Sequence, residues 1–171
     1  MQHVATSSEV FITGLRNAHA MENQALAIIK PQLNRLENYP EMSQLLARHQ
    51  HETEAQLQRI DDILLTFDES ASGLKDMMMS MTGTMAAVTH TMAPDEILKN
   101  SMANFAFEHF EIAAYTSLIT MAGMCGASAA ISHLEQSLLE ERQMADMIEQ
   151  MLPTVTERYI TLKASGETAG V

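Results

Sequence analysis

The stretch FEHFEIAAY, residues 107–115, carries two glutamates three positions apart in a run that is otherwise rich in Phe, Ile, Ala and Tyr. In a helix, Glu108 and Glu111 lie on one face, and Tyr115 follows one turn later on that face. The face lies beside an apolar seam, so both carboxylates point toward the interior. A buried carboxylate needs a compensating partner, because removing a charge from water costs several kcal/mol.

The composition of the chain favours an all-α fold. Its 171 residues are 46% hydrophobic and include 15 Met, no Trp, 7 Gly and 4 Pro. Long helices packed with unbranched side chains fit this composition better than turn-rich sheets do. A chain of this length buries a sizeable core as one domain. We therefore expect a single domain over residues 1–164 and a flexible tail over residues 165–171.

The charge balance limits the partners of the protein. With 10 Lys+Arg against 22 Asp+Glu, the formal net charge is -12. Such a surface repels phosphate backbones and anionic membranes, and it favours small cations as partners. The single cysteine, Cys125, excludes an internal disulfide, and the N-terminal segment lacks the pattern of a signal peptide. We expect a soluble, cytoplasmic protein that binds neither nucleic acid nor membranes.

Apolar residues recur at helical spacing in four long segments. The first helix is expected over residues 8–37, capped by Ser7 or Ser8 and bent at Pro31, and the second over residues 40–67. Two further helices and a short terminal one are then expected over residues 94–126, 128–152 and 154–163, with Pro153 ending the fourth.

A long connection joins the second and third helices. Residues 68–93 are rich in Met, and we expect a short helix there whose Met side chains fill a groove. A connection of this length can return along the molecule and start the second hairpin at the same end as the first. The pattern therefore predicts a ferritin-like four-helix bundle with a long helical crossover, because an up-and-down bundle needs only a short loop there.

Each long helix directs at least one carboxylate inward near its middle. Glu22 and Glu52 are separated by the same number of residues as Glu111 and Glu141, so the two hairpins place these glutamates equivalently. Bound divalent cations or shared protons would offset the repulsion within such a cluster. We predict a dinuclear metal site, and its candidate ligands are Glu22, His49, Glu52, Glu108, Glu111 and Glu141.

Several roles stay open at this point. His49, three residues before Glu52, could bind the metal or hold a carboxylate in place, and His19 has the same relation to Glu22. Tyr115 is expected to pack or to form a hydrogen bond rather than to act as a radical site. A single inward glutamate is more often solvated at a helix edge than bound to a metal, so the prediction depends on the matched set.

Four segments carry a resemblance to a known family: LRNAHAMENQA, NYPEMSQLLARHQHETEAQLQRID, PDEILKNSMANFAFEHFEIAAYTSL and LLEERQMAD. Together they resemble the YciE/YciF family of ferritin-like stress proteins over about residues 11–159. The resemblance implies a ferritin-like bundle, a homodimer and an association with general stress responses in bacteria, but it supplies no established reaction. Carried over by position, the ferritin-like metal pattern falls on Glu22, Glu52, Glu108 or Glu111, and Glu141.

The sequence also departs from the usual ferritin-like pattern. Such sites carry Glu-x-x-His on two helices, whereas this chain has His49 before Glu52, and Met144 three residues after Glu141. Two divalent ions are expected, with iron as the first choice and manganese or magnesium as alternatives.

Two functions follow from these observations. The leading hypothesis is a metal-binding protein of stress defence that removes peroxide or oxidises Fe(II), with Glu52 and Glu141 bridging the metals. In it Glu22 and Glu111 are terminal ligands, and His49 and Glu108 complete the shell. The alternative is a non-enzymatic structural or interaction protein in which the centre only stabilises the bundle, so whether the protein is an enzyme stays open.

Overall fold

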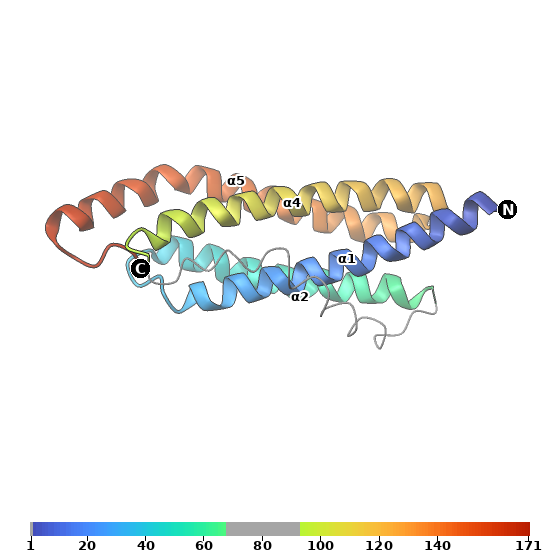
Figure 1. Cartoon of the computed structure of the whole chain (residues 1–171), viewed down its shortest axis with the longest axis horizontal. Helices are drawn as coiled ribbons and strands as arrows, with labels where there is room; N and C mark the ends of the chain where they lie inside the picture. The colour runs from blue at the N-terminus through green and yellow to red at the C-terminus, as the bar shows by residue number, and fades with distance from the viewer. Residues whose placement is uncertain (1, 68–92) are drawn as a thin grey trace.

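The computed structural model describes residues 2–67 and 93–171. Four long helices make up nearly all of this part of the chain, and no strand occurs in it (Figure 1). The helices are α1 (Gln2–Leu33), α2 (Pro40–Leu65), α4 (Glu96–Cys125) and α5 (Ser128–Ser165). The all-α prediction is confirmed.

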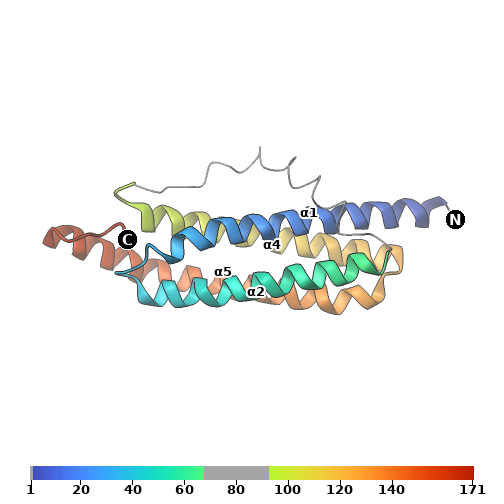
Figure 2. The same cartoon turned by 90° about the horizontal axis from the view of Figure 1, so that it is seen from below.

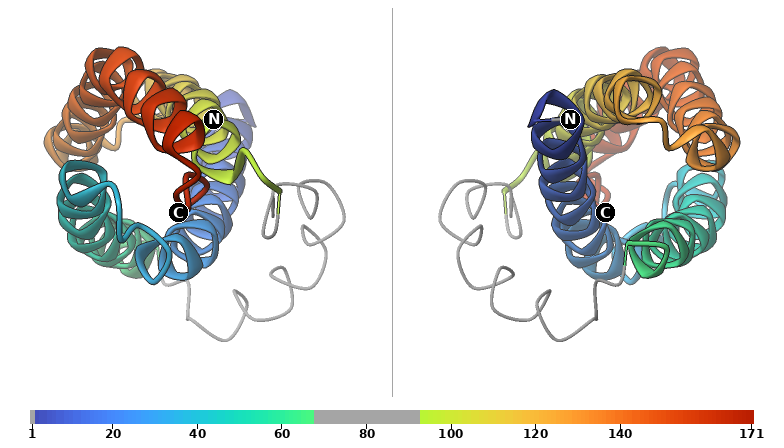
Figure 3. Two further views of the ribbon diagram at one scale, coloured as in Figure 1. Left: turned by 90° about the vertical axis from the view of Figure 1, so that its left-hand side faces the viewer. Right: turned by 90° about the vertical axis from the view of Figure 1, so that its right-hand side faces the viewer.

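The helices form a ring of four around a common core, as the end-on views in Figure 3 show. Helix α1 packs against α2 and α4, and α5 packs against α4 and α2. Helices α2 and α4 start at the same end of the bundle, while α1 and α5 start at the opposite end (Figures 1 and 2). The second hairpin, α4 and α5, thus starts at the end opposite to the first, so the expectation that both hairpins start at one end is wrong. Because α2 ends at the end of the bundle opposite to the start of α4, the separation agrees with a long connection between them. The Met-rich helix expected within residues 68–93 lies almost entirely outside the described residues.

Apolar side chains from all four helices fill the interior. The side chains of Phe11 and Leu15 are fully buried, and so are Ile60 on α2, Leu134 on α5 and Ile148 on α5. Burying such a side chain contributes about 1.5–3 kcal/mol, so this core supplies most of the energy that holds the helices together. The polar centre described below is therefore enclosed by a conventional apolar core.

The first helix differs from its predicted bounds. It begins at Gln2 rather than at residue 8, and it ends at Leu33, two residues after Pro31. Proline removes one backbone hydrogen bond and crowds the preceding turn, which weakens the end of the helix. The chain then leaves helical geometry, so that Leu36 and Tyr39 become buried at the end of the bundle.

The expected break before Pro153 is wrong. Helix α5 continues through Pro153 to Ser165, so the predicted short terminal helix is its last part. Proline leaves the carbonyl group four residues earlier, on Glu149, without its helical partner. Because Glu149 and Pro153 are exposed, water can satisfy that carbonyl group and the proline ring meets no neighbouring helix. The helix therefore continues and extends beyond the other helices (Figure 1).

The segment expected as a flexible tail makes specific contacts instead. Gly166, with a φ of 76°, ends α5, and the chain returns to the start of α4. There the hydroxyl group of Tyr39 donates a hydrogen bond to the carbonyl oxygen of Ala169 at 2.6 Å. The amide of Asn38 donates to the carbonyl oxygens of Thr168 and Val171. Ile97 donates its backbone N–H to Gly170 at 3.1 Å. We call residues 168–171 the C-terminal clasp. The extent of the domain, residues 1–164, stays a prediction.

A pair of amide side chains links α1 to α4 in the interior. Gln32 and Asn104 exchange two hydrogen bonds, each 3.0 Å long, and both side chains are buried. We expect Asn104→Ala to destabilise the protein by about 1–3 kcal/mol, because Gln32 is then left buried without a partner. Urea unfolding would measure this change.

The control is Asn34→Ala, since the exposed Asn34 makes only one long hydrogen bond, to Lys30. It should change stability by less than about 0.5 kcal/mol. Equal stabilities of the two variants would contradict a stabilising role for the buried pair.

Candidate metal centre

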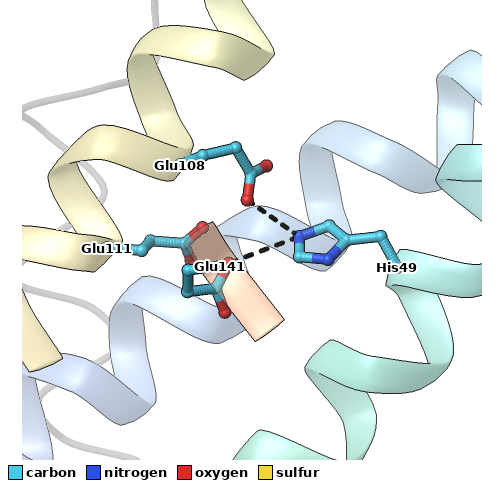
Figure 4. A group of neighbouring side chains, drawn as sticks. All are labelled: His49, Glu108, Glu111 and Glu141. Carbon is cyan, nitrogen blue, oxygen red and sulfur yellow. Dashed lines mark ion pairs between the residues drawn. The ribbon is translucent and has the colours of Figure 1, made fainter. Parts of the chain in front are cut away.

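Four buried side chains meet near the middle of the bundle. His49 of α2, Glu108 and Glu111 of α4, and Glu141 of α5 each offer one ligand atom, and these atoms all lie within 4.8 Å of one another. Figure 4 shows the three carboxyl groups directed toward one another, with the imidazole of His49 approaching from the opposite helix. None of the four residues is more than 3% exposed. The sequence prediction had named all four residues.

The helical spacing explains how these groups converge. On α4, Asn104, Glu108, Glu111, Tyr115 and Leu118 are all buried, so they form one inward face. On α5, Glu141 stands between the buried residues Leu138 and Ala145. The carboxylates therefore occupy positions that an apolar side chain would otherwise fill.

The imidazole of His49 is surrounded by carboxylates. Its Nε2 atom lies 3.3 Å from Oε2 of Glu108 and 3.7 Å from Oε2 of Glu141. Its Nδ1 atom lies 3.4 Å from Oε2 of Glu52. Burial lowers the pKa of His49, but the nearby carboxylates raise it more, so the net pKa is well above its usual value. Nε2 is thus the nitrogen that faces the centre.

Glu22 lies next to the four converging residues. Its side chain is fully buried, and Oε1 accepts a hydrogen bond from the hydroxyl group of Tyr115. Burial raises the pKa of Glu22 to about 8, against the lowering effects of Tyr115 and His49, and the charges of Glu108 and Glu140 add to the rise. The expected packing or hydrogen-bonding role of Tyr115 is confirmed.

Most of the carboxylate oxygens in the centre have no hydrogen-bond partner. Among the described residues, both oxygens of Glu111, both of Glu141 and Oε2 of Glu22 are buried and without one. Oε2 of Glu108 has only its ion-pair contact with His49. Burial, and then the neighbouring carboxylates, raise the pKa of Glu111 and Glu141 well above the usual range.

This arrangement fits a bound cation. Unpartnered buried carboxylates cost several kcal/mol each, and their mutual repulsion adds to that cost. One imidazole nitrogen and several carboxylate oxygens form a ligand set suited to divalent manganese, iron or magnesium. The group of His49, Glu108, Glu111 and Glu141 could therefore hold a metal ion, and Glu22 lies within its electrostatic reach.

Glu52 does not lie where a bridging ligand would. Its side chain is 26% exposed, and its carboxylate contacts Nδ1 of His49 and Nε of Arg48, each at 3.4 Å. The structure thus places Glu52 behind His49, where it orients the ring, and not within the converging group. Carboxylates that bind the second nitrogen of a metal-ligating histidine commonly act in this way.

Four further histidines lie away from the centre. His19 contacts Asp61 at 3.4 Å through Nε2 and the amide of Asn23 at 3.2 Å through Nδ1, so the alternative that made it a ligand is not supported. His51, His109 and His133 are exposed. Met144 is fully buried beside Glu141, at the position where the usual pattern has histidine.

One polar group near the centre had no predicted role. Arg59 of α2 forms a two-pronged ion pair with Glu140 of α5, and the buried Gln56 donates to the same carboxylate. Gln56 follows His49 by seven residues and so lies on the same face of α2, but helical spacing does not identify Glu140 as its partner. The contact depends on the packing of α2 against α5.

A four-helix bundle with buried carboxylates on α1, α4 and α5, a buried histidine on α2 and a long connection between its two hairpins is consistent with a ferritin-like bundle. The chain belongs to the family described as Domain of unknown function (DUF892), whose sequence profile matches residues 6–161. It is 30% identical to Protein YciF of Escherichia coli (strain K12) over 150 residues, which cover 82% of this chain and 86% of that protein.

Two crystal structures share the fold. A protein from Xanthomonas campestris pv. campestris superposes with a TM-score of 0.77 at 25% identity, covering 92% of this chain and 99% of the other. The E. coli stress protein YciF gives a TM-score of 0.68 at 23% identity, over 85% and 94% of the two chains. The similarity found is to YciF, so a closer resemblance to YciE within the family stays a prediction.

The metal-free protein is expected to lose stability as the pH rises. Because the pKa of Glu22 is raised from 4.5 to about 8, the folded state keeps a proton that the unfolded chain releases. The resulting penalty is absent below pH 4.5, grows as pH rises and is complete above about 8. His49 acts in the same direction, since its raised pKa stabilises the folded state below pH 6.5 and that contribution is lost at higher pH.

Urea unfolding in the presence of a chelator, from about pH 5 to about pH 9, would measure this dependence. Glu22→Gln should flatten the curve, because it removes one of the responsible groups. A free energy of unfolding that stays constant or rises over this range would contradict the expected burial of ionisable carboxyl groups.

Proposed function

We propose that this protein is a ferritin-like metal-binding protein whose centre holds two divalent ions. His49, Glu108, Glu111 and Glu141 would hold the metals together with Glu22, and Glu52 would orient His49. The observation that carries the proposal is the set of six buried carboxylate oxygens that lack a hydrogen-bond partner. A second ion fits the charge balance, because the group contains four buried glutamates and one histidine.

Iron is the proposed native metal, with manganese or magnesium as alternatives. Bound iron would supply redox chemistry toward peroxide or dioxygen, as expected for a protein that removes peroxide or oxidises Fe(II). Within the protein, Tyr115 would keep Glu22 in place through its hydrogen bond, and the apolar core would limit the access of water.

The physiological setting is also part of the proposal. The similar E. coli protein YciF is described as a stress protein, and we extend a role in bacterial stress defence to this chain. No described helix combines the length and the apolar character that a membrane span needs. We further propose a cytoplasmic homodimer that does not bind nucleic acid, in keeping with the net charge of -12 and with the exposed apolar residues Phe110, Met124 and Leu139.

Replacing two central carboxylates tests the metal site directly. The double variant Glu111→Gln/Glu141→Gln should lose nearly all bound metal, because both carboxylates become neutral amides of similar size. In the absence of metal, the same variant should be more stable than the parent protein above pH 8, since two buried ionisable groups are gone. Elemental analysis and urea unfolding would measure the two effects.

The matched control is Glu135→Gln/Glu149→Gln, which removes two exposed carboxylates from α5, the helix that carries Glu141. It should keep the metal content of the parent protein. Normal metal content in the central double variant would rule out this centre as the binding site.

A second candidate function is structural, with the metal serving only to hold the helices together. The burial of the four converging residues favours it, because none of these residues is more than 3% exposed and a large substrate could not touch them. In this case iron-loaded protein should not consume peroxide, although removing the metal should lower the melting temperature.

Peroxide consumption therefore separates the two functions. We expect iron-loaded protein to consume many equivalents of peroxide per centre, at a rate that the Glu111→Gln/Glu141→Gln variant does not reach. An oxygen electrode or a peroxide-sensitive dye would follow the reaction. Consumption that stops at one equivalent or less would favour the structural role.

A further inference from the structure

The interface between α2 and α5 is lined by polar side chains near the centre. Gln56 and Arg59 of α2 contact Ser137 and Glu140 of α5. Arg48 of α2 contacts Met147 of α5 and, within its own helix, Glu52. Of the four neighbouring helix pairs, α2 and α5 pack least closely. By contrast, the interface of α1 and α4 contains the Gln32 and Asn104 amide pair, in which each amide satisfies the other.

A two-pronged ion pair closes this interface at the surface. The guanidinium group of Arg59 donates to Oε2 of Glu140 at 2.6 Å and to Oε1 at 2.8 Å. It also donates to Oγ of Ser137 at 3.1 Å. Each side chain of the ion pair is 15% exposed, so the pair stands at the boundary between solvent and interior.

Gln56 lies behind the ion pair and is fully buried. Its Nε2 atom donates to Oε2 of Glu140 at 3.1 Å, and a carboxylate can only accept, so the orientation of the amide is determined. Oε1 therefore points away from Glu140 and has no hydrogen-bond partner. Among the described residues, it is the one buried side-chain atom without a partner that does not belong to a glutamate of the centre.

The ion pair also adjoins the centre. Glu140 directly precedes Glu141 on α5, and Gln56 lies one helical turn after Glu52, which contacts His49. Within the centre, Oε2 of Glu22 is buried and without a partner. Acceptor oxygens thus occur at the surface on Glu140, behind it on Gln56, and in the centre on Glu22. A divalent cation moving inward would exchange water for oxygen ligands at each stage.

We propose that Glu140 and Gln56 form the port through which a divalent cation reaches the centre, and that Arg59 is the latch that closes it. The proposal rests on the function proposed above, because it requires that the centre binds a cation. Arg59 occupies both carboxylate oxygens of Glu140, so the cation can be captured only when the ion pair opens. Gln56 then offers its free carbonyl oxygen as the next ligand.

The rate of metal loading tests this proposal independently of affinity. Metal-free protein is mixed with Mn(II), and uptake is followed by loss of the paramagnetic resonance signal of free Mn(II). Arg59→Gln should load about two to five times faster than the parent protein, which is the factor expected for removing one solvent-accessible ion pair. Glu140→Gln should load about ten times more slowly, because the attracting charge is lost. Both variants should reach the parent protein's final metal content.

The matched control is Arg35→Gln at the far end of the interface between α1 and α4. Arg35 also forms a bidentate ion pair, donating to the two carboxylate oxygens of Glu96 at 2.9 Å and 2.7 Å, but it does not adjoin the centre. Its loading rate should equal that of the parent protein. Raising the salt concentration should reduce the difference between Arg59→Gln and the parent, because salt weakens the ion pair that only the parent retains.

The outcomes separate the port from the centre. If parent protein and both variants load at one rate to the same final content, the port is wrong while the metal centre stands. If the parent protein binds no Mn(II) at equilibrium, both proposals are overturned. If circular dichroism shows that Arg59→Gln does not fold, Arg59→Lys is used instead, because it keeps the positive charge but loses the bidentate contact with Glu140. Arg59→Lys should load metal faster than the parent protein. An unchanged loading rate would refute the role of Arg59 as the latch.

Discussion

Repulsion among buried carboxylates is the constraint on which this protein depends. Four glutamates from three helices lie within one enclosed region, and burial raises the pKa of Glu22, Glu111 and Glu141. The apolar core must therefore supply enough energy to hold the helices together despite this local cost. Removing the repulsion by binding a cation adds to the stability of the same four helices. Metal binding and the packing of the bundle therefore both contribute to the free energy of unfolding of the same four helices.

The polar groups around the centre divide into two kinds. Tyr115 and Glu52 each hold one candidate ligand, through Glu22 and His49 respectively, and so fix the direction in which that ligand points. Arg59 and Gln56 instead hold Glu140, which lies outside the converging group. The first kind gives the centre its geometry, and the second connects it to the surface. In each kind one side chain is buried, Tyr115 or Gln56, and the other is partly exposed, Glu52 or Arg59.

Much of this could be predicted from the sequence, because the helical period identifies inward positions. Glu22, Glu108, Glu111 and Glu141 all lie on apolar stripes, and all are buried. Which of His49 and Glu52 reaches the centre was harder to predict. Residues three positions apart on a helix project about 60° from each other, so the helical period alone does not decide between them. The continuation of α5 through Pro153 depends on the exposure of that turn, and the partner of Gln56 depends on the packing of α2 against α5. Neither is encoded in local spacing.

The C-terminal clasp has a consequence for the time course of synthesis. Tyr39 binds the carbonyl oxygen of Ala169, which is 130 residues further along the chain. At ribosomal speeds of about 5–20 residues per second, the Tyr39 side chain emerges on the order of ten seconds before its partner does. During that interval its hydroxyl group must form hydrogen bonds with water or with another polar group. The turn between the first two helices therefore cannot reach its final environment until residue 169 has been translated.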